Sequence, residues 1–451
     1  MEKNRETGNK MGTMTMPKLI INMSLPLMIS LLVQSLYNIA DSIFVARLGE
    51  EALTATSLAF PIQLLMIAVA VGTSVGINAL LSKSIGAKDY EITENIAATG
   101  VILAGAGMIV FMLAGFCCTS WFVSLFTDDR VIGKLCEEYL YICMIFCAGT
   151  FIGTIYQRFL QSVGDTFDSM MTLIAGAVTN LILDPILIFG LAGIPALGIR
   201  GAAVATVIGQ WVAAIMAVIL NKWRNPLVNV RLHGYRPQKQ ILKQIYKVGL
   251  PTIVTQAIGS VMVTAVNAIL MPYSSTAVAF FGVYYKLQNF LFMPMNGLGQ
   301  AAIPIVGYNY GARKKERVIG LFKTILPMAA GIALAATCIF LVIPGPLLRI
   351  FSASEEMLEL GVPALRIISL TFAFASVTMV LGYSVSGIGN GVVNMMGTAI
   401  RQLILLVPVL YLFVKCAGIH YAWYAFWIAE AAAVVYAACA ARKELLKKGL
   451  L

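Results

Sequence analysis

Long apolar runs follow one another along almost the whole chain and are separated by short polar or charged stretches. Each run has about 20 residues or more, the length that an α-helix needs to cross the hydrocarbon core of a bilayer. None alternates in polarity as a barrel strand does. The runs predict an all-α integral membrane protein with twelve transmembrane helices, at 17–46, 54–82, 95–120, 136–160, 168–190, 198–220, 245–271, 277–307, 318–345, 358–388, 393–415 and 419–440.

The composition and charge agree with this class and add an orientation. Hydrophobic residues make up 59% of the 451 and charged residues 12%, against about 25% charged in soluble domains. Basic residues concentrate in both terminal tails and in alternate connections, above all in "NKWRNPLVNVRLHGYRPQKQILKQIYK" at 221–247. Because such residues stay on the cytoplasmic side, we expect a protein of the cell membrane with both termini cytoplasmic. The net charge of +11 then reflects topology, and we expect no nucleic-acid partner.

The second half of the chain repeats the first with a constant offset. A shift of 225 pairs Pro251 with Pro26 and Gly389 with Gly164, and the register holds without a gap. Six helices per repeat make the two copies parallel in the membrane, a plan that is typical of transporters. The predicted parts are a cytoplasmic tail at 1–16, an N-lobe at 17–220, a basic cytoplasmic linker at 221–244, a C-lobe at 245–440 and a cytoplasmic tail at 441–451.

Two predicted spans of the N-lobe carry buried acids. In the first span Gln34, Tyr37, Asn38 and Asp41 are spaced i, i+3, i+4, i+7 and share one face. An ionised carboxylate at the bilayer centre costs about 2.5 to 3.5 kcal/mol and is kept where something binds or titrates it. We therefore interpret Asp41 as part of an ion site.

The fifth span supplies the second acid. In "VTNLILDPILIFG", Asn180 and Asp184 are four residues apart and face together, and Pro185 removes the partner of one backbone carbonyl. A carboxylate, an amide oxygen and a freed carbonyl resemble a Na⁺ shell, so Asp41, Asn180 and Asp184 form a possible Na⁺ site. Buried carboxylates serve equally as H⁺ carriers, and a static polar network between helices stays open as an alternative.

The C-lobe differs at the matching places, because the shift sends Asp41 to Val266 and Asp184 to Val409. Its polar residues include Lys286, Gln288 and Asn289, and Lys286 pairs with an acid, snorkels or holds an anionic group. The roles of Arg401 and Glu430 stay open. An adaptable substrate wall, for which ordinary packing is an equal explanation, would combine polar, aromatic and methionine side chains: Gln34, Tyr37, Phe60, Gln63, Met170, Met171, Gln288, Asn289 and Met293.

Three segments identify a resemblance that runs from about 17 to 440. "SLPLMISLLVQSLYNIADSIFVARLGEEALTATSLAFPI", "TNLILDPILIFG" and "KLQNFLFMPMNGLGQAAIPIVGYNYGARKKERV" resemble the MATE (multidrug and toxic compound extrusion) transporters, prokaryotic type. The resemblance implies a V-shaped pair of lobes and Na⁺- or H⁺-coupled antiport of organic, often cationic, compounds. It also implies an N-lobe coupling site at Asp41 and Asp184, surrounded by further residues that include Asn38, Asn180 and Thr206, the last by motif only.

Other functions remain as alternatives. A flippase of lipid-linked anionic precursors on a related duplicated fold would need several basic residues in its cavity. A channel or membrane-embedded enzyme is the other alternative, and the lack of a nucleophile–base pair or metal cluster counts against it. No nucleotide-binding G-x-x-x-x-G-K-[ST] motif is present, so either an ion gradient is the energy source or transport is passive. We expect no enzymatic activity and no cofactor besides the coupling ion, with small organic molecules such as cationic drugs or dyes as partners, the lipid bilayer around the chain, and a monomer.

Overall fold

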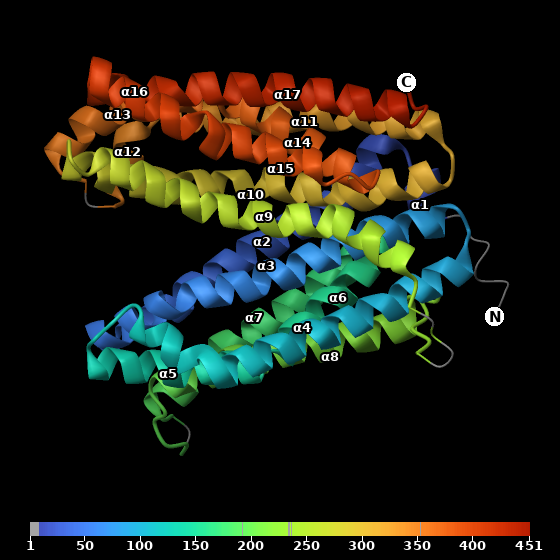
Figure 1. Ribbon diagram of the computed structural model, residues 1–451, viewed down its shortest axis with the longest axis horizontal. Coiled ribbons are helices and arrows are strands. Elements are labelled where there is room, and N and C mark those ends of the chain that lie inside the picture. The colour runs from blue at the N-terminus through green and yellow to red at the C-terminus, as the bar shows by residue number, and fades with distance from the viewer. Residues whose placement is uncertain (1–8, 192, 233–234, 236, 352) are drawn as a thin grey trace. The chain divides into compact units, whose positions relative to one another are not determined.

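The computed structural model of the protein describes residues 9–191, 193–232, 235, 237–351 and 353–451. Half of the predicted 1–16 tail, and positions 233, 234 and 236 of the linker, lie outside the described residues. The helices (Figure 1) are α1 (Lys10–Thr13), α2 (Met16–Ala46), α3 (Glu50–Gly86), α4 (Tyr90–Ser124), α5 (Arg130–Ile145), α6 (Ala148–Ser162), α7 (Thr166–Phe189), α8 (Ile199–Arg224), α9 (Lys239–Leu270), α10 (Ser275–Gly311), α11 (Lys315–Val342), α12 (Pro344–Arg349), α13 (Glu355–Ser369), α14 (Phe372–Gly387), α15 (Val392–Ala399), the π-helix η2 (Ile400–Ile404), α16 (Leu406–Ala417), the 3₁₀-helix η3 (Ile419–Tyr424) and α17 (Ala425–Lys447).

The prediction of an all-α membrane fold is confirmed. Within the described residues, ten helices are long and apolar enough to cross a membrane, and the number rises to twelve when each of two bent pairs counts as one span. The pairs are α5 with α6, bent by 45°, and α13 with α14, bent by 48°. The sequence predicted each pair as one continuous helix, at 136–160 and 358–388.

Side-chain hydrogen bonds to the backbone explain the second of these bends. The hydroxyls of Ser369 and Thr371 donate to the carbonyls of Arg366 and Ile368, at 3.0 Å and 2.8 Å. The carbonyl of Ser369 accepts from the Thr337 hydroxyl at 2.8 Å. Backbone carbonyls at this point accept side-chain hydroxyls in addition to, or in place of, the N–H groups of the next helical turn. The regular helix is interrupted there, so α13 ends and α14 starts in a new direction.

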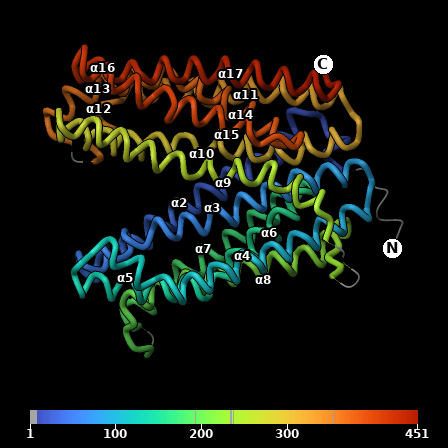
Figure 2. Tube along the Cα trace, viewed as in Figure 1, coloured from blue at the N-terminus to red at the C-terminus, as the bar shows by residue number. Residues whose placement is uncertain are grey.

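The described residues form two compact units. Figure 2 traces the backbone through both, coloured from blue at the N-terminus to red at the C-terminus. Among the described residues, unit 1 comprises 9–11 and 29–249, and unit 2 comprises 12–28 and 250–451. The division between units falls inside α2 and inside α9. The lobe boundaries proposed from the sequence, 17–220 and 245–440, stay a prediction.

The internal repeat is visible in the backbone. Helices α3 and α10 are both 37 residues long, and they start at Glu50 and Ser275, which are 275 − 50 = 225 positions apart. Each is followed by a non-glycine residue with positive φ, Lys88 at 56° and Arg313 at 57°, again 225 apart. Non-glycine residues seldom adopt this conformation, so its recurrence at the same offset shows that the two halves share one backbone plan.

Close helix contacts without intervening side chains hold unit 1 together. Helices α7 and α8 pack against each other, and Gly176 and Gly209 lie where they meet. A Cβ added at either glycine would come within 2.7 Å of the carbonyl oxygen of the other. Small residues at such crossings let membrane helices approach closely. This crossing brings the polar side chains of α7 up against those of α8.

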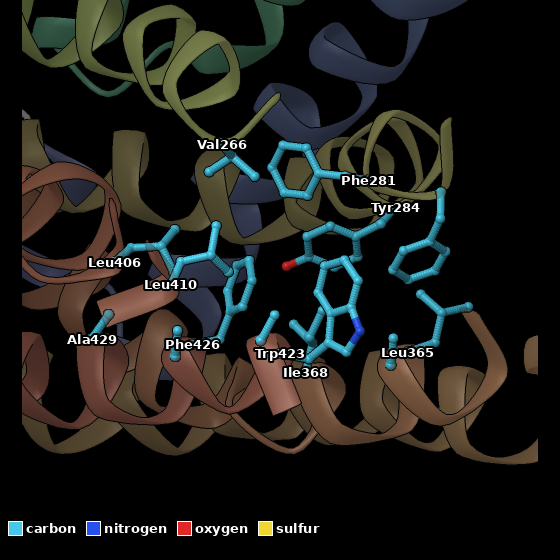
Figure 3. Close-up of a cluster of buried hydrophobic side chains, with 14 of the residues drawn as sticks. Val266, Phe281, Tyr284, Leu365, Ile368, Leu406, Leu410, Trp423, Phe426 and Ala429 are labelled. Atoms are coloured by element: carbon cyan, nitrogen blue, oxygen red, sulfur yellow. The ribbon is translucent and has the colours of Figure 1, made fainter. Parts of the chain in front are cut away.

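Unit 2 has a hydrophobic core rich in aromatic rings, with side chains from α9, α10, α11, α12, α13, α14, α16, η3 and α17; Figure 3 shows part of it. The rings of Phe280 and Trp423 meet edge to face at 4.9 Å, and those of Tyr284 and Phe426 at 5.6 Å. Val266, the counterpart of Asp41 in the repeat, is fully buried in this core. The position that carries an acid in the first half therefore serves packing in the second.

Candidate ion and substrate site

Asp184 and Asn180 form the centre of a polar cluster inside unit 1. Asp184 is fully buried and Asn180 is 3% exposed. The Asn180 amide donates to the Asp184 carboxyl at 3.3 Å and to the Thr206 hydroxyl of α8 at 3.4 Å. Helix α7 continues through Pro185 to Phe189. Because the ring nitrogen of Pro185 carries no hydrogen, the carbonyl of Leu181 lacks its usual helical donor.

Asp41 of α2 lies beside this cluster. Its carboxyl is close enough to that of Asp184 for the two to interact electrostatically. Three buried oxygens have no donor among the described residues: Oδ1 of Asp41, Oδ1 of Asn180 and Oδ2 of Asp184. The two carboxyls are within hydrogen-bond reach of each other, which a proton shared between them would satisfy. Unpaired buried oxygens are costly in the membrane interior. They mark a place where something else completes the bonding.

Aromatic and amide side chains surround the two acids. Tyr37 hydrogen-bonds to Gln34 and interacts electrostatically with Asp41 and Asp184. On the other side the Gln63 amide faces the Tyr139 hydroxyl at 3.4 Å and the Cys143 sulfur at 3.5 Å. Tyr139 and Cys143 both interact electrostatically with Asp41. The cluster therefore draws side chains from α2, α3, α5, α7 and α8 of one unit.

The chemistry of this cluster suits a small cation or a proton. Two carboxyl groups so close together in a low-dielectric interior do not both keep a negative charge unless a cation lies with them. Carboxylate and amide oxygens are hard ligands of the kind that Na⁺ and Ca²⁺ take. A proton on one carboxyl removes the repulsion equally well. The three unpaired oxygens thus fit either ion.

The turn before α7 fixes where that helix starts. The Asp165 carboxyl accepts the backbone N–H of Asp168 at 3.1 Å, and Asp168 forms an ion pair with Arg224 of α8 at 3.0 Å. Burial, together with the nearby charge of Asp168, raises the pKa of Asp165, while Lys10 acts in the opposite direction. Burial also lowers the pKa of Lys10. This cap and ion pair hold the N-terminal end of α7 against the C-terminal end of α8.

The other residues predicted for the site differ in their exposure, and their roles stay a prediction. Asn38 is exposed on α2, and its carbonyl accepts the Ser42 hydroxyl at 2.9 Å. Phe60 is 58% exposed and Met170 is 7% exposed, with Met171 partly buried. The remaining predicted residues belong to unit 2, where two are exposed and two are partly buried: Lys286, Asn289, Gln288 and Met293.

Tyr139 and Cys143 are the neighbours of Asp41 that the sequence did not single out. They lie four residues apart on α5 and so share a face. The same face of α5 carries Cys136, which is also buried. The spacing of Cys136, Tyr139 and Cys143 at i, i+3 and i+7 is the sequence signal that indicates a buried polar face of α5 and not a face in contact with lipid.

Comparison with known proteins gives consistent relatives. The MatE family profile matches residues 26–186 and 251–412. The chain is 27% identical over 404 residues to the multidrug export protein MepA of Staphylococcus saprophyticus, with 87% of this chain and 86% of that protein covered. It is 26% identical over 401 residues to the probable multidrug resistance protein NorM of Thermotoga maritima, with coverage of 88% and 86%.

Solved structures agree. A multidrug resistance MATE family transporter of the MOP superfamily, in an outward-facing conformation, has a TM-score of 0.91 at 26% identity and covers 99% of both chains. A MOP superfamily transporter from Pyrococcus furiosus has a TM-score of 0.90 at 25% identity, with 98% and 99% covered.

Proposed function

The chain belongs to the MatE family, and from that membership we propose that it is an ion-coupled antiporter that exports organic, cationic amphipathic compounds. Its relatives are multidrug exporters, and they indicate that the chain is a multi-pass membrane transporter. The finer statement concerns the coupling ion, the coupling residues and the charge of the substrate. The observation that carries it is the close pair of carboxyls of Asp41, which is partly buried, and Asp184, which is fully buried, together with the three oxygens that lack a donor among the described residues.

Competition for negative charge gives the exchange mechanism. When Na⁺ or H⁺ occupies the Asp41–Asp184 pair, the carboxyl charge is neutralised and a cationic substrate loses its attraction to this region. When the ion leaves, the charge returns and a substrate cation binds more tightly. Differential affinity of this kind is what shifts a transporter between its states. Alternating access of the two lobes then converts ion entry into substrate export.

The remaining polar side chains take supporting roles in this proposal. Asn180, Asn38 and Thr206 would orient the acids or supply oxygens to the ion. Tyr37, Gln34, Gln63 and Phe60 would form the adaptable wall against which an amphipathic substrate packs, with Met170 and Met171. The residues of unit 2 assigned to the same task are Lys286, Gln288, Asn289 and Met293. We also propose a monomer in the cell membrane with both termini cytoplasmic, as the distribution of basic residues suggests.

Transport in proteoliposomes tests the proposal. The purified protein is assayed with a fluorescent organic cation under a Na⁺ gradient and, separately, under a pH gradient. Asp41→Asn and Asp184→Asn should lose gradient-driven transport under the gradient that drives the wild type. The matched control is Asp128→Asn, which removes an exposed carboxylate from the same unit.

Two outcomes would change the proposal. Wild-type rates in both Asn variants under either gradient would show that these acids are not the coupling groups. If neither gradient moves any cation while a lipid-linked anionic precursor is translocated, the flippase alternative replaces the exporter.

A further inference from the structure

Unit 2 contains a buried ion pair that the coupling site in unit 1 does not explain. Arg401 lies in the π-helix η2 and Glu430 in α17. They are 7% and 4% exposed, and Nε of Arg401 is 3.2 Å from Oε1 of Glu430. Single turns of π-helix inside a longer helix occur frequently at functional sites. The pair therefore calls for an account of why two charges are buried here.

The bonding of this pair is incomplete. Oε2 of Glu430 has no hydrogen-bond partner in the described part of the chain, and Nε of Arg401 lies at ion-pair distance without a hydrogen bond. A buried pair recovers the cost of removing its charges from water only when the geometry is good and the remaining polar atoms are bonded. Neither condition is met. The charged pair is therefore held only weakly against its neutral alternative.

Both residues have a second neighbour ready on α10. The Arg401 guanidinium lies 5.9 Å from the centre of the Phe292 ring, within the range of a cation–π contact. Tyr284 interacts electrostatically with Glu430 and with Arg401, and Gln288 lies beside its hydroxyl. That buried hydroxyl has no hydrogen bond of good geometry within the described residues. If Glu430 were neutral, Arg401 would keep the ring as a partner and the Tyr284 hydroxyl could bond the carboxylic acid.

Other charges near the pair are few. From α10, Tyr284 interacts with both charges and Tyr285 interacts with Tyr284, and the next residue of the helix, Lys286, is exposed. His420 of η3, the helix that packs against α17, is also exposed. Helices α14 and α15 contain no Asp, Glu, Lys, Arg or His. The nearest charged residue in the sequence of α17 is Arg442, about 18 Å along the helix axis from Glu430. Lys415 at the far end of α16 lies over the Tyr411 ring, 5.8 Å from its centre. The state of Glu430 thus depends mainly on Arg401 and Tyr284.

We propose that Glu430 is a second proton-binding group of this protein, located in unit 2 and released for protonation when Arg401 moves away from it while keeping its contact with the Phe292 ring. In this step a proton from water adds to a carboxylate oxygen of Glu430 and forms an O–H bond, and no covalent bond breaks. The buried arginine keeps its positive charge, so proton uptake changes the net charge of the cluster from zero to plus one. The π-helix that carries Arg401 is the element that moves.

Infrared difference spectroscopy on the purified full-length protein in lipid vesicles tests this directly. The signal is the carbonyl stretch of a protonated carboxylic acid, which appears when the pH is lowered. The background variant Asp41→Asn/Asp184→Asn removes the acids of unit 1. In that background a band should appear with falling pH, should already be present at neutral pH in Arg401→Gln, and should be absent in Arg401→Gln/Glu430→Gln.

The double variant also protects the test against misfolding, because it removes both charges and leaves neither alone in the interior. If the unit 1 background does not fold, the same comparison is made with Asp41 and Asp184 intact. Their bands are then common to both proteins and cancel. A spectrum that is the same with and without Arg401→Gln/Glu430→Gln at every pH where the protein is folded would overturn the proposal. The readout is protonation, so a failure of the proposed transport function leaves this result unaffected.

Discussion

Gly209→Ala is expected to weaken the candidate ion site without altering any of its oxygens. An added Cβ at Gly209 would lie 2.7 Å from the Gly176 carbonyl oxygen and 3.1 Å from Cβ of Asn180. Ordinary contacts start at 3.4 Å, so α7 and α8 must separate locally by 3.4 − 2.7 = 0.7 Å. The Asn180–Thr206 hydrogen bond is already 3.4 Å long and would be lost.

The energies follow from these distances. Forcing an extra carbon into a packed contact costs about 1 to 3 kcal/mol, and replacing a helical glycine by alanine returns about 0.5 to 1 kcal/mol. The difference is a net destabilisation of about 0 to 2.5 kcal/mol, with about 1 kcal/mol at the middle of the range. Loss of one hydrogen bond of about 1 kcal/mol should weaken ion affinity about fivefold.

Thermal unfolding and ion-dependent transport measure the two effects. The half-maximal concentration of the coupling ion should rise about fivefold while the maximal rate changes little. The control is Gly105→Ala on α4, where an added Cβ meets nothing within 4 Å, and it should be neutral or stabilising. The reasoning fails if Gly209→Ala binds the ion like wild type, because the spacing of α7 and α8 would then not set the site.

Three further changes test other contacts. Thr206→Val should weaken ion affinity, because it removes the hydroxyl that Asn180 meets; Thr206→Ser should not, and equal effects of the two in transport assays would exclude a role for the hydroxyl. Asn225→Ala should lower unfolding stability by about 2 kcal/mol, because its buried amide donates to the Phe159 carbonyl at 3.2 Å; unchanged thermal unfolding would refute this. Asp165→Asn should stabilise the protein at neutral pH. Because the pKa of Asp165 is raised in the folded state, the ionised form of this one group destabilises the fold; that effect is absent below pH 3.8 and grows as the pH rises through the folded pKa. The difference in melting temperature between Asp165→Asn and wild type should therefore disappear on acidification. A difference that does not vary with pH would contradict a raised pKa of Asp165.

The fold was predictable because its main cause is local. Continuous apolar length decides which segments cross a membrane, and all helices long enough to span begin or end within a few residues of the predicted runs. The repeat was predictable because a turn with positive φ requires glycine at one position, and that glycine can be recognised in both halves of the sequence. Gly164 and Gly389 both adopt positive φ, at 93° and 95°. The two bent pairs were missed, since an apolar run does not show where hydroxyls such as Thr371 compete for the backbone.

The candidate site was only partly predictable. Asn180 and Asp184 are neighbours on one helix, so their spacing alone placed them together, and the structure shows the contact at 3.3 Å. Asp41 shares no helix with them, and its approach to Asp184 depends on how α2 packs within unit 1. The stripe on α2 was predicted as one face, yet Asn38 is exposed and Asp41 is partly buried. Helical spacing gives a face to within about 100°, and packing decides which edge of that face is covered.

The same reasoning explains why Glu430 could not be assigned from the sequence. Its partner Arg401 is on a different helix, and a π-helix changes the direction in which that helix presents its side chains. An intramembrane acid and an intramembrane base, each costly alone, become intelligible only as a pair 3.2 Å apart. In the first half the repeat places the carboxyls of Asp41 and Asp184 close together. In the second half Val266 and Val409 stand at the matching positions, and the buried acid Glu430 has the base Arg401 beside it. If both of our proposals hold, a cation or a proton compensates the acids of unit 1, whereas Arg401 compensates Glu430 until a proton replaces it, so the two halves differ in how they compensate buried charge.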